Sequence, residues 1–209
     1  APGGGIAAAA MGQGTRAVAR SGTSMAAPHV AGAAALVWAA QRARGRALEA
    51  RDVAALLVTR AAEDVVHEAE GSAPPIARCG AGALDAWSPA TADLVVRSGR
   101  VASAGLGFLA LDRGRQLWVP ITVTNLADTP RRFDVGSRFR DPADQGSGLQ
   151  FSSLSLAAGP GETVAGRVAA ILSPDRLPPW LLRGGALISD PEAMAVSEID
   201  GWLEVRAYD

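Results

Sequence analysis

The sequence predicts two regions of different fold class: a largely helical region over residues 1–92 and an all-β sandwich over residues 93–209. Before Ala92 the chain holds long alanine-rich runs and a stripe of apolar residues at helical spacing. After Ala92, glycine and proline separate short runs of alternating apolar and polar residues, which are typical of β-strands. A length of 209 residues is sufficient for two small domains.

The first predicted helix begins near Ser24 and extends to about Arg44. Residues 30–40 include no charged side chain, which indicates a helix that protein surrounds on most sides. Arginines end the run and Gly45 follows them, as expected for a cationic last turn and a glycine stop. Pro28 is placed in the first turn, where a missing N–H is tolerated. We expect this helix to be the central support of the first region.

A second, amphipathic helix is predicted over Leu48–Arg60. Its apolar stripe consists of Val53, Leu56 and Leu57. The glycine-rich segment Gly80–Ala86 then leads to a last short helix near Trp87-Ser88-Pro89. No Lys-Ser/Thr pair follows these glycines and no dinucleotide fingerprint is present, so they do not predict a phosphate-binding loop.

The second region is predicted to hold at least five strands. They are Gln116–Thr124, Arg131–Phe139, Leu149–Leu156, Glu162–Leu172 and Gly201–Tyr208. Residues 125–130 are predicted to form the turn from which the second strand returns, with Phe133, Val135 and Phe139 alternating inward. Turns such as Ala158-Gly159-Pro160-Gly161 separate the later strands. Many short strands with such turns favour a β-sandwich.

Ser24 has the local context of a catalytic nucleophile. It follows two small residues and begins a long uncharged run, so it is expected at a helix N-terminus. There the unpaired backbone N–H groups and the positive end of the helix dipole face the same space as the hydroxyl. An oxyanion that develops at this place is held next to the attacking oxygen.

Residues 21–32, with the sequence SGTSMAAPHVAG, resemble the nucleophile motif of the subtilisin-like serine peptidases. Ala1-Pro2-Gly3 resembles the turn that precedes this motif, and the GAGALDA segment at residues 80–86 adds to the match. The resemblance implies that residues 1–92 are the C-terminal part of an α/β catalytic domain. It implies that Ser24 is the nucleophile of a serine endopeptidase and that its own N–H is one oxyanion donor. A protein or peptide substrate and a secreted or cell-envelope location are further implications.

The other catalytic groups of that family are expected outside this chain. The family order is Asp, His, Ser, yet the residues before Ser24 include no Asp, His or Asn. We therefore expect the triad acid and base and the Asn oxyanion donor in an N-terminal part of the catalytic domain, on a longer chain or a partner polypeptide. The 209 residues alone are predicted to be inactive. The alternative is a non-catalytic pseudoenzyme, or a binding or structural module, that keeps the serine motif.

Neither histidine suits the missing base. His29 follows Ser24 by five residues, which places it about 140° around and about 7.5 Å along the same helix, so we expect a structural role. His67 is expected on the surface near a helix end. A triad of Ser24, Asp64 and His67, in the order of the α/β-hydrolases, requires a strand-turn-helix elbow followed by a larger sheet. Ala26 also disfavours an esterase of that class, because its usual elbow carries glycine at this position.

The second region resembles, more loosely, the fibronectin type III-like domains that follow the catalytic domain in some large secreted subtilisin-like peptidases. The segments that carry this resemblance are Trp118–Asn125 and Leu156–Glu162. It implies a fibronectin type III-like or Ig-like sandwich over residues 93–209, without chemistry of its own. A packed spacer is expected, and an exposed carbohydrate-binding or protein-binding face is the alternative.

Charge and composition disfavour several kinds of partner. The chain has 20 basic and 21 acidic residues and a net charge of −1, so no nucleic-acid partner is expected. Its longest uncharged run, residues 25–41, is too short for a membrane span. One cysteine and two histidines predict neither a disulfide nor a zinc site. No cofactor or metal is expected here, while calcium dependence of a longer protein stays open.

Overall fold

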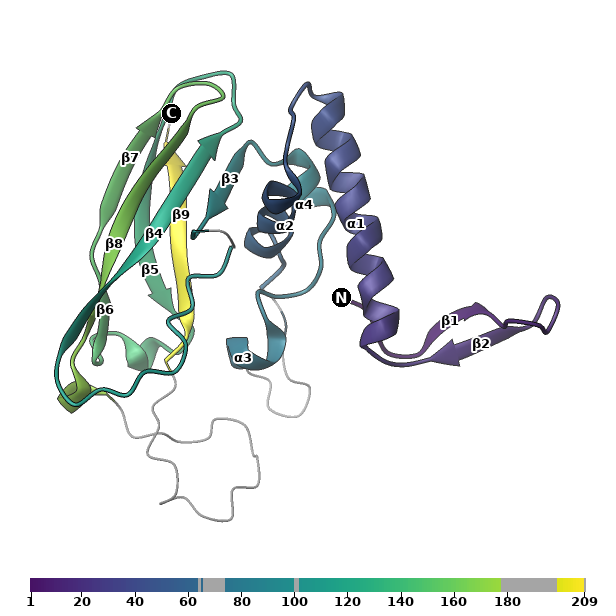
Figure 1. The fold of residues 1–209 in the computed structure, drawn as a ribbon, viewed down its shortest axis with the longest axis horizontal. Coiled ribbons are helices and arrows are strands. Elements are labelled where there is room, and N and C mark those ends of the chain that lie inside the picture. Colours follow the sequence, from purple (N-terminus) through teal and green to yellow (C-terminus); the bar gives the residue numbers. More distant parts are fainter. Residues whose placement is uncertain (64, 66–73, 100–101, 178–198, 209) are drawn as a thin grey trace, which may run out of the picture.

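The computed structural model describes residues 1–63, 65, 74–99, 102–177 and 199–208 (Figure 1). In these residues an N-terminal hairpin is followed by a group of helices and then by two β-sheets. Strands predominate, and the C-terminal part of the chain is all-β apart from two short 3₁₀ turns. The predicted all-β character of the second region agrees with this arrangement.

A β-hairpin that the sequence analysis did not predict projects from the body (Figure 1). It consists of β1 (Ile6–Ala9) and β2 (Ala17–Arg20), paired antiparallel with Ile6 opposite Arg20. Its connecting loop turns at two glycines with φ of 73° and 63°, a conformation that glycine adopts without steric cost. All four side chains of β2 are exposed, so the hairpin makes little contact with the rest of the described chain.

In the part of the chain that the structure describes, four α-helices follow the hairpin. They are α1 (Thr23–Ala43), α2 (Ala50–Thr59), α3 (Ile76–Cys79) and α4 (Trp87–Thr91). The predicted end of the first helix is confirmed, because α1 stops before Gly45, whose φ is 75°. At the start of α2 the backbone N–H of Glu49 donates to the side chain of Asp52 over 3.0 Å, as half of a capping box. The short α4 packs against α1, as predicted for the last helix of the first region.

The environment of α1 differs from the prediction. Only Ala33, Val37 and Gln41 are buried on this helix, while the side chains of Leu36 and Trp38 are 64% and 53% exposed. The expectation that protein surrounds α1 on most sides is therefore wrong for the described residues. The other helices cover one stripe of α1 and leave the rest of its uncharged surface open.

Beyond the helices, the described residues form seven strands in two sheets. They are β3 (Leu94–Arg97), β4 (Arg115–Asn125), β5 (Arg131–Phe139), β6 (Leu149–Phe151), β7 (Leu154–Ala158), β8 (Thr163–Leu172) and β9 (Gly201–Tyr208). Their spatial orders are β3-β4-β8-β6 and β7-β5-β9, and all pairs are antiparallel. One hydrophobic core fills the space between the sheets, including the predicted inward residues Phe133, Val135 and Phe139.

Two details of the strand prediction are wrong. β5 does not return along β4, because the turn at residues 126–130 carries the chain across to the other sheet. The buried side chain of Asn125 stabilises this crossing, since its Nδ2 donates to the carbonyls of Thr129 (2.8 Å) and Ala158 (3.1 Å). Residues 149–156 form two strands in different sheets. The break coincides with Ser152, whose hydroxyl accepts from the N–H of Ala169 in place of a backbone carbonyl.

β3 contributes to two hydrophobic cores at once. Leu94 points into the core of the sandwich, whereas its neighbour Val95 packs with Val37 and Leu56 of the helices. Alternation along a strand makes this possible, because successive side chains lie on opposite faces. Arg97 lies on the same face of β3 as Val95 and forms a 3.2 Å ion pair with Asp52 of α2. The helices and the sandwich therefore share this strand.

Gly82 lies at a close backbone contact in the GAGALDA segment. It has φ of 134°, and a Cβ built on it overlaps the carbonyl oxygen of Ala62. Ala62 and Ala83 exchange two backbone hydrogen bonds, of 2.9 and 2.8 Å, which hold the two segments at this separation.

We expect Gly82→Ala to lower the free energy of unfolding by about 2–4 kcal/mol, because both the backbone conformation and the contact become strained. Gly80→Ala is the matched control. Gly80 has φ of 63° but no atom close to its missing Cβ, so only the conformational cost of about 1–2 kcal/mol is expected. Urea unfolding of both variants measures the difference. Equal losses would show that the contact with Ala62 is unimportant.

Candidate functional site

Ser24 is the second residue of α1, and the N-cap of this helix is Gly22. Gly22 has φ of 151° and ψ of 168°, and its carbonyl accepts the first hydrogen bonds of the helix from Met25 (3.0 Å) and Ala26 (3.3 Å). The backbone N–H groups of Thr23 and Ser24 have no acceptor among the described residues. The side chain of Ser24 is exposed. The structure thus places a free hydroxyl beside unpaired N–H groups at the positive end of a helix of 21 residues.

The N-terminal residues and the serine motif are in direct contact. The N–H of Gly22 donates to the carbonyl of Gly3 over 2.8 Å, and the N–H of Gly5 donates to the hydroxyl of Ser21 over the same distance. A Cβ on Gly3 would lie 3.0 Å from the carbonyl oxygen of Gly22. Glycine at this position allows the segment to run close to the helix start and so defines the approach to Ser24.

His29 is bonded to its own helix. Its Nδ1 lies 2.8 Å from the carbonyl oxygen of Met25, and its ring is exposed. The ring lies at an open hollow of about 420 Å³ at the side of α1, and the hydroxyl of Ser24 makes no hydrogen bond with any described residue. The expected structural role agrees with this geometry.

The position of Pro28 differs from the prediction. It is not in the first turn but is the sixth residue of α1. Because proline has no N–H, the carbonyl of Ser24 lacks its usual helical donor.

The alternative triad falls on residues that are not described. Asp64 and His67 both lie outside the described ranges, so the structure gives no distance from either residue to Ser24.

Among the described residues, no group of three or more His, Cys, Asp or Glu side chains is arranged to hold a metal ion. In the same part of the chain, none of the helices combines the length and the apolar character that crossing a bilayer requires.

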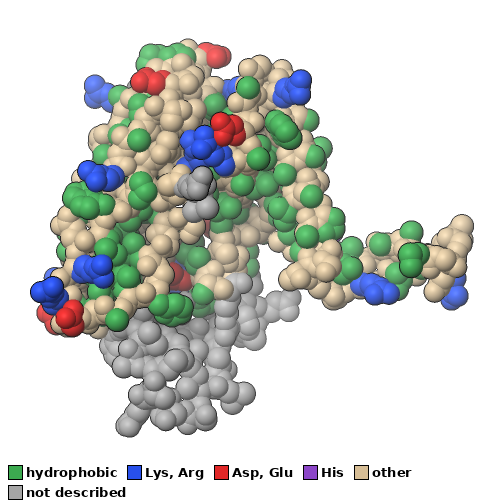
Figure 2. Space-filling view, viewed as in Figure 1, with side chains coloured by type: hydrophobic (Ala, Val, Ile, Leu, Met, Phe, Trp, Pro, Cys, Tyr) green, Lys and Arg blue, Asp and Glu red, His purple; other side chains and the backbone are tan. Residues whose placement is uncertain are grey.

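The exposed surface of α1 and of the hairpin is uncharged over much of its length. Figure 2 shows hydrophobic side chains along α1 and on the projecting hairpin, which is consistent with the exposures of Val30, Leu36, Trp38 and Met11. Monomeric proteins rarely leave contiguous apolar surface of this kind open. The surface begins next to Ser24, so a polypeptide that covers it also approaches this serine.

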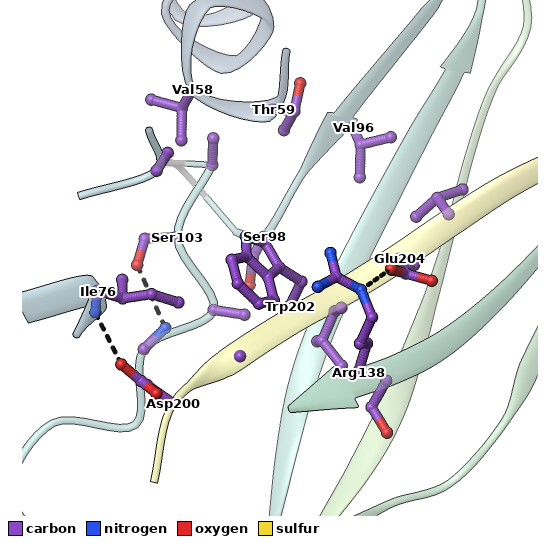
Figure 3. Close-up of a pocket in the computed structure, with 18 of the residues that line it drawn as sticks. Val58, Thr59, Ile76, Val96, Ser98, Ser103, Arg138, Asp200, Trp202 and Glu204 are labelled. Carbon is purple, nitrogen blue, oxygen red and sulfur yellow. Dashed lines mark hydrogen bonds and ion pairs between the residues drawn. The ribbon is translucent and has the colours of Figure 1, made fainter. Parts of the chain in front are cut away.

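A second concave site, which sequence reasoning missed, lies between the helical region and the sandwich (Figure 3). It is a cavity of about 960 Å³. On its wall the guanidinium of Arg138 stacks over the ring of Trp202, 4.0 Å from the centroid. Arg138 also pairs with Glu204 at 2.5 Å and with Glu63 of the helical region at 2.7 Å. These residues are far apart in the sequence, so no spacing pattern indicated them.

The electrostatics of this wall follow from its ion pairs. Hydrogen bonds from Arg138 and then from Arg206 lower the pKa of Glu204 below its ordinary value. The hydrogen bond to Glu204 raises the pKa of Arg138, outweighing its partial burial. Both groups are therefore charged at neutral pH and satisfy each other. The wall holds the two regions together and does not present an unpaired acid or base for catalysis.

Comparison with known proteins bears on the first region of the chain. Residues 5–83 match the model of the subtilase family. No curated protein matches the chain significantly. The matched segment contains the hairpin, α1 with Ser24, and α2. The match supports the interpretation that these residues are a subtilisin-like fragment of serine peptidase lineage. We call residues 5–83 the subtilase segment.

Proposed function

We propose that residues 1–92 are the C-terminal part of the α/β catalytic domain of a subtilisin-like serine endopeptidase and that Ser24 is its nucleophile. The observation that carries the proposal is the position of Ser24. Its hydroxyl is exposed in the first turn of α1, beside backbone N–H groups without acceptors, within the subtilase segment. A helix start with this geometry suits a nucleophile that must also stabilise negative charge.

The proposed reaction is acyl transfer to Ser24. A histidine outside the 209 residues takes the hydroxyl proton while Oγ attacks the peptide carbonyl, and an aspartate holds that histidine in the productive tautomer. The N–H of Ser24 and a side-chain amide of an Asn outside the chain stabilise the oxyanion. The histidine then gives its proton to the leaving amine, and water releases the acyl group from Ser24.

The uncovered surface of α1 supports the proposal that a further polypeptide segment completes the domain. Leu36 and Trp38 are more than half exposed on a helix without charged residues from 30 to 40. Burial of such surface is favourable by roughly 25 cal/mol per Å² of apolar area. We propose that an N-terminal part of the catalytic domain covers it and brings the Asp, the His and the Asn to Ser24.

The second region is proposed to be a fibronectin type III-like sandwich that follows the catalytic domain as a packed module. Seven strands in two antiparallel sheets around one core are consistent with this class. A secreted or cell-envelope location is proposed for the complete protein on the family match. No cofactor has a role in the proposed reaction.

Labelling with a fluorophosphonate tests the assignment. We expect the 209-residue chain alone to react negligibly, because no base activates Ser24, and the polypeptide extended in the N-terminal direction to react rapidly. In that longer polypeptide, Ser24→Ala is expected to abolish labelling and Ser21→Ala to preserve it. Mass spectrometry of the labelled peptide identifies the modified serine.

Two results would contradict the proposal. Rapid labelling of the 209-residue chain alone would mean that a base lies within it. No labelling of the folded, extended polypeptide would favour the alternative of a non-catalytic pseudoenzyme or binding module.

A further inference from the structure

The two outer faces of the sandwich differ in chemistry. On the three-stranded sheet several outward side chains are charged, and among them Glu204 is bonded to Arg138 at 2.5 Å and to Arg206 at 2.9 Å. On β4, β8 and β6 the outward positions carry a single charged side chain, that of Arg167. A sheet face that only meets solvent is usually polar and charged. The helices cover this face at β3, and the remaining part, on β4, β8 and β6, has the composition of a binding surface.

The register of the strands defines this surface. Gln116 of β4 lies opposite Ile171 of β8, which in turn lies opposite Gln150 of β6. The next row along the strands pairs Trp118 with Ala169. Arg167 is the next outward residue of β8 beyond Ala169. We call this surface the β4–β8 platform. Its exposed residues are Gln116, Trp118, Gln150, Arg167 and Ile171.

Trp118 is the largest side chain of the β4–β8 platform. Its side chain is 55% exposed, yet Ala169 directly opposite is only 6% exposed although it points outward. Trp118 thus lies beside Ala169 on the outer face of the sheet, and more than half of its surface is open to solvent. The guanidinium carbon of Arg167 lies 5.2 Å from the ring centroid, a cation–π distance that restrains the ring. Ile171, at 42% exposure, extends the apolar surface.

We propose that the β4–β8 platform binds a neutral polysaccharide chain. A flat, exposed aromatic ring stacks on the apolar C–H face of a pyranose, and its amphipathic character suits a wet interface. The amides of Gln116 and Gln150 each donate and accept hydrogen bonds, as sugar hydroxyls do. They flank Ile171 at two strand spacings, about 10 Å apart, so each amide can contact a different sugar unit of one chain.

Charge and topology favour this occupant over other polymers. A polyanion such as nucleic acid requires a cluster of basic residues, and the platform has only Arg167. A peptide that adds as a strand binds through backbone groups at the edge of a sheet, whereas the platform residues project from the face of the sheet. Recognition at this surface therefore depends on side chains alone. Amides, hydroxyls and an aromatic ring match an uncharged, hydroxyl-rich chain.

Isothermal titration of the 209-residue chain with cellohexaose and chitohexaose tests the proposal, with an alginate hexamer as the acidic comparison. We expect binding of at least one neutral hexamer and at least about tenfold weaker binding by Trp118→Ala, which corresponds to about 1.4 kcal/mol. Gln116→Ala is expected to weaken binding by a smaller factor. Tyr208→Ala is the matched control, because Tyr208 is an exposed aromatic residue on the three-stranded sheet and should have no effect.

Three results would overturn the proposal. One is the absence of binding to both neutral hexamers. Another is an equal effect of Trp118→Ala and Tyr208→Ala. The third is tighter binding of the alginate hexamer than of either neutral hexamer, because a single arginine does not explain it. Circular dichroism of the Trp118→Ala and Trp118→Phe variants verifies the fold, and Trp118→Phe is expected to retain most of the affinity.

Discussion

Replacing Ser24 by alanine is expected to lower kcat by on the order of 10⁶ in the polypeptide that joins this chain to the N-terminal part of its catalytic domain. In subtilisin, loss of the catalytic serine or histidine alone has an effect of this order. Alanine removes the attacking oxygen and leaves the backbone N–H groups of the helix start in place. Binding of the peptide substrate is therefore expected to persist while acyl transfer stops. Steady-state hydrolysis of a chromogenic peptide measures kcat and KM separately.

Ser21→Ala is the matched control for this experiment. Ser21 is also exposed and lies three residues from Ser24, but its hydroxyl accepts a 2.8 Å hydrogen bond from the N–H of Gly5. Its loss removes one hydrogen bond of about 1 kcal/mol, so we expect kcat/KM to fall by less than about tenfold. If Ser24→Ala retains more than about one hundredth of the activity, or if both variants lose equally, Ser24 is not the nucleophile.

The position of Ser24 at a helix start is predictable from sequence because its determinants are local. Small residues, an uncharged run and the glycine at residue 22 specify a helix start, and the structure has α1 begin at Thr23. The end of this helix and the bounds of β5 and β9 are likewise predictable, because glycine conformation and side-chain alternation act over a few residues.

The environment of that helix is not predictable from the same residues. An uncharged run on α1 indicates contact with protein but does not identify which polypeptide provides the contact, and the described chain leaves Leu36 and Trp38 open. The crossing of β5 to the second sheet depends on hydrogen bonds of Asn125 to Ala158, which lie far apart in sequence. The Arg138–Trp202 stack depends on strand register in the same way.

The domain boundary between residues 92 and 93 stays a prediction. Two adjacent residues of β3 can be used to test whether the helical region and the sandwich unfold independently. We expect Leu94→Ala to lower the free energy of unfolding by about 2–5 kcal/mol and Val95→Ala by about 2 kcal/mol. Leu94 belongs to the core of the sandwich and Val95 to that of the helices. Leu36→Ala, on the exposed surface of α1, is the control and should change stability by less than about 0.5 kcal/mol.

Calorimetry distinguishes one folding unit from two. The backbone N–H of Ile76 donates to the carboxylate of Asp200 over 2.7 Å, and the mostly buried Arg97 and Asp52 pair across the junction at 3.2 Å. Separation of the regions would leave these polar groups without partners in a low-dielectric environment, which is costly. We therefore expect a single transition that both β3 variants shift to lower temperature. Two transitions, of which Leu94→Ala shifts one and Val95→Ala the other, would show that the sandwich folds independently of the serine-bearing helices.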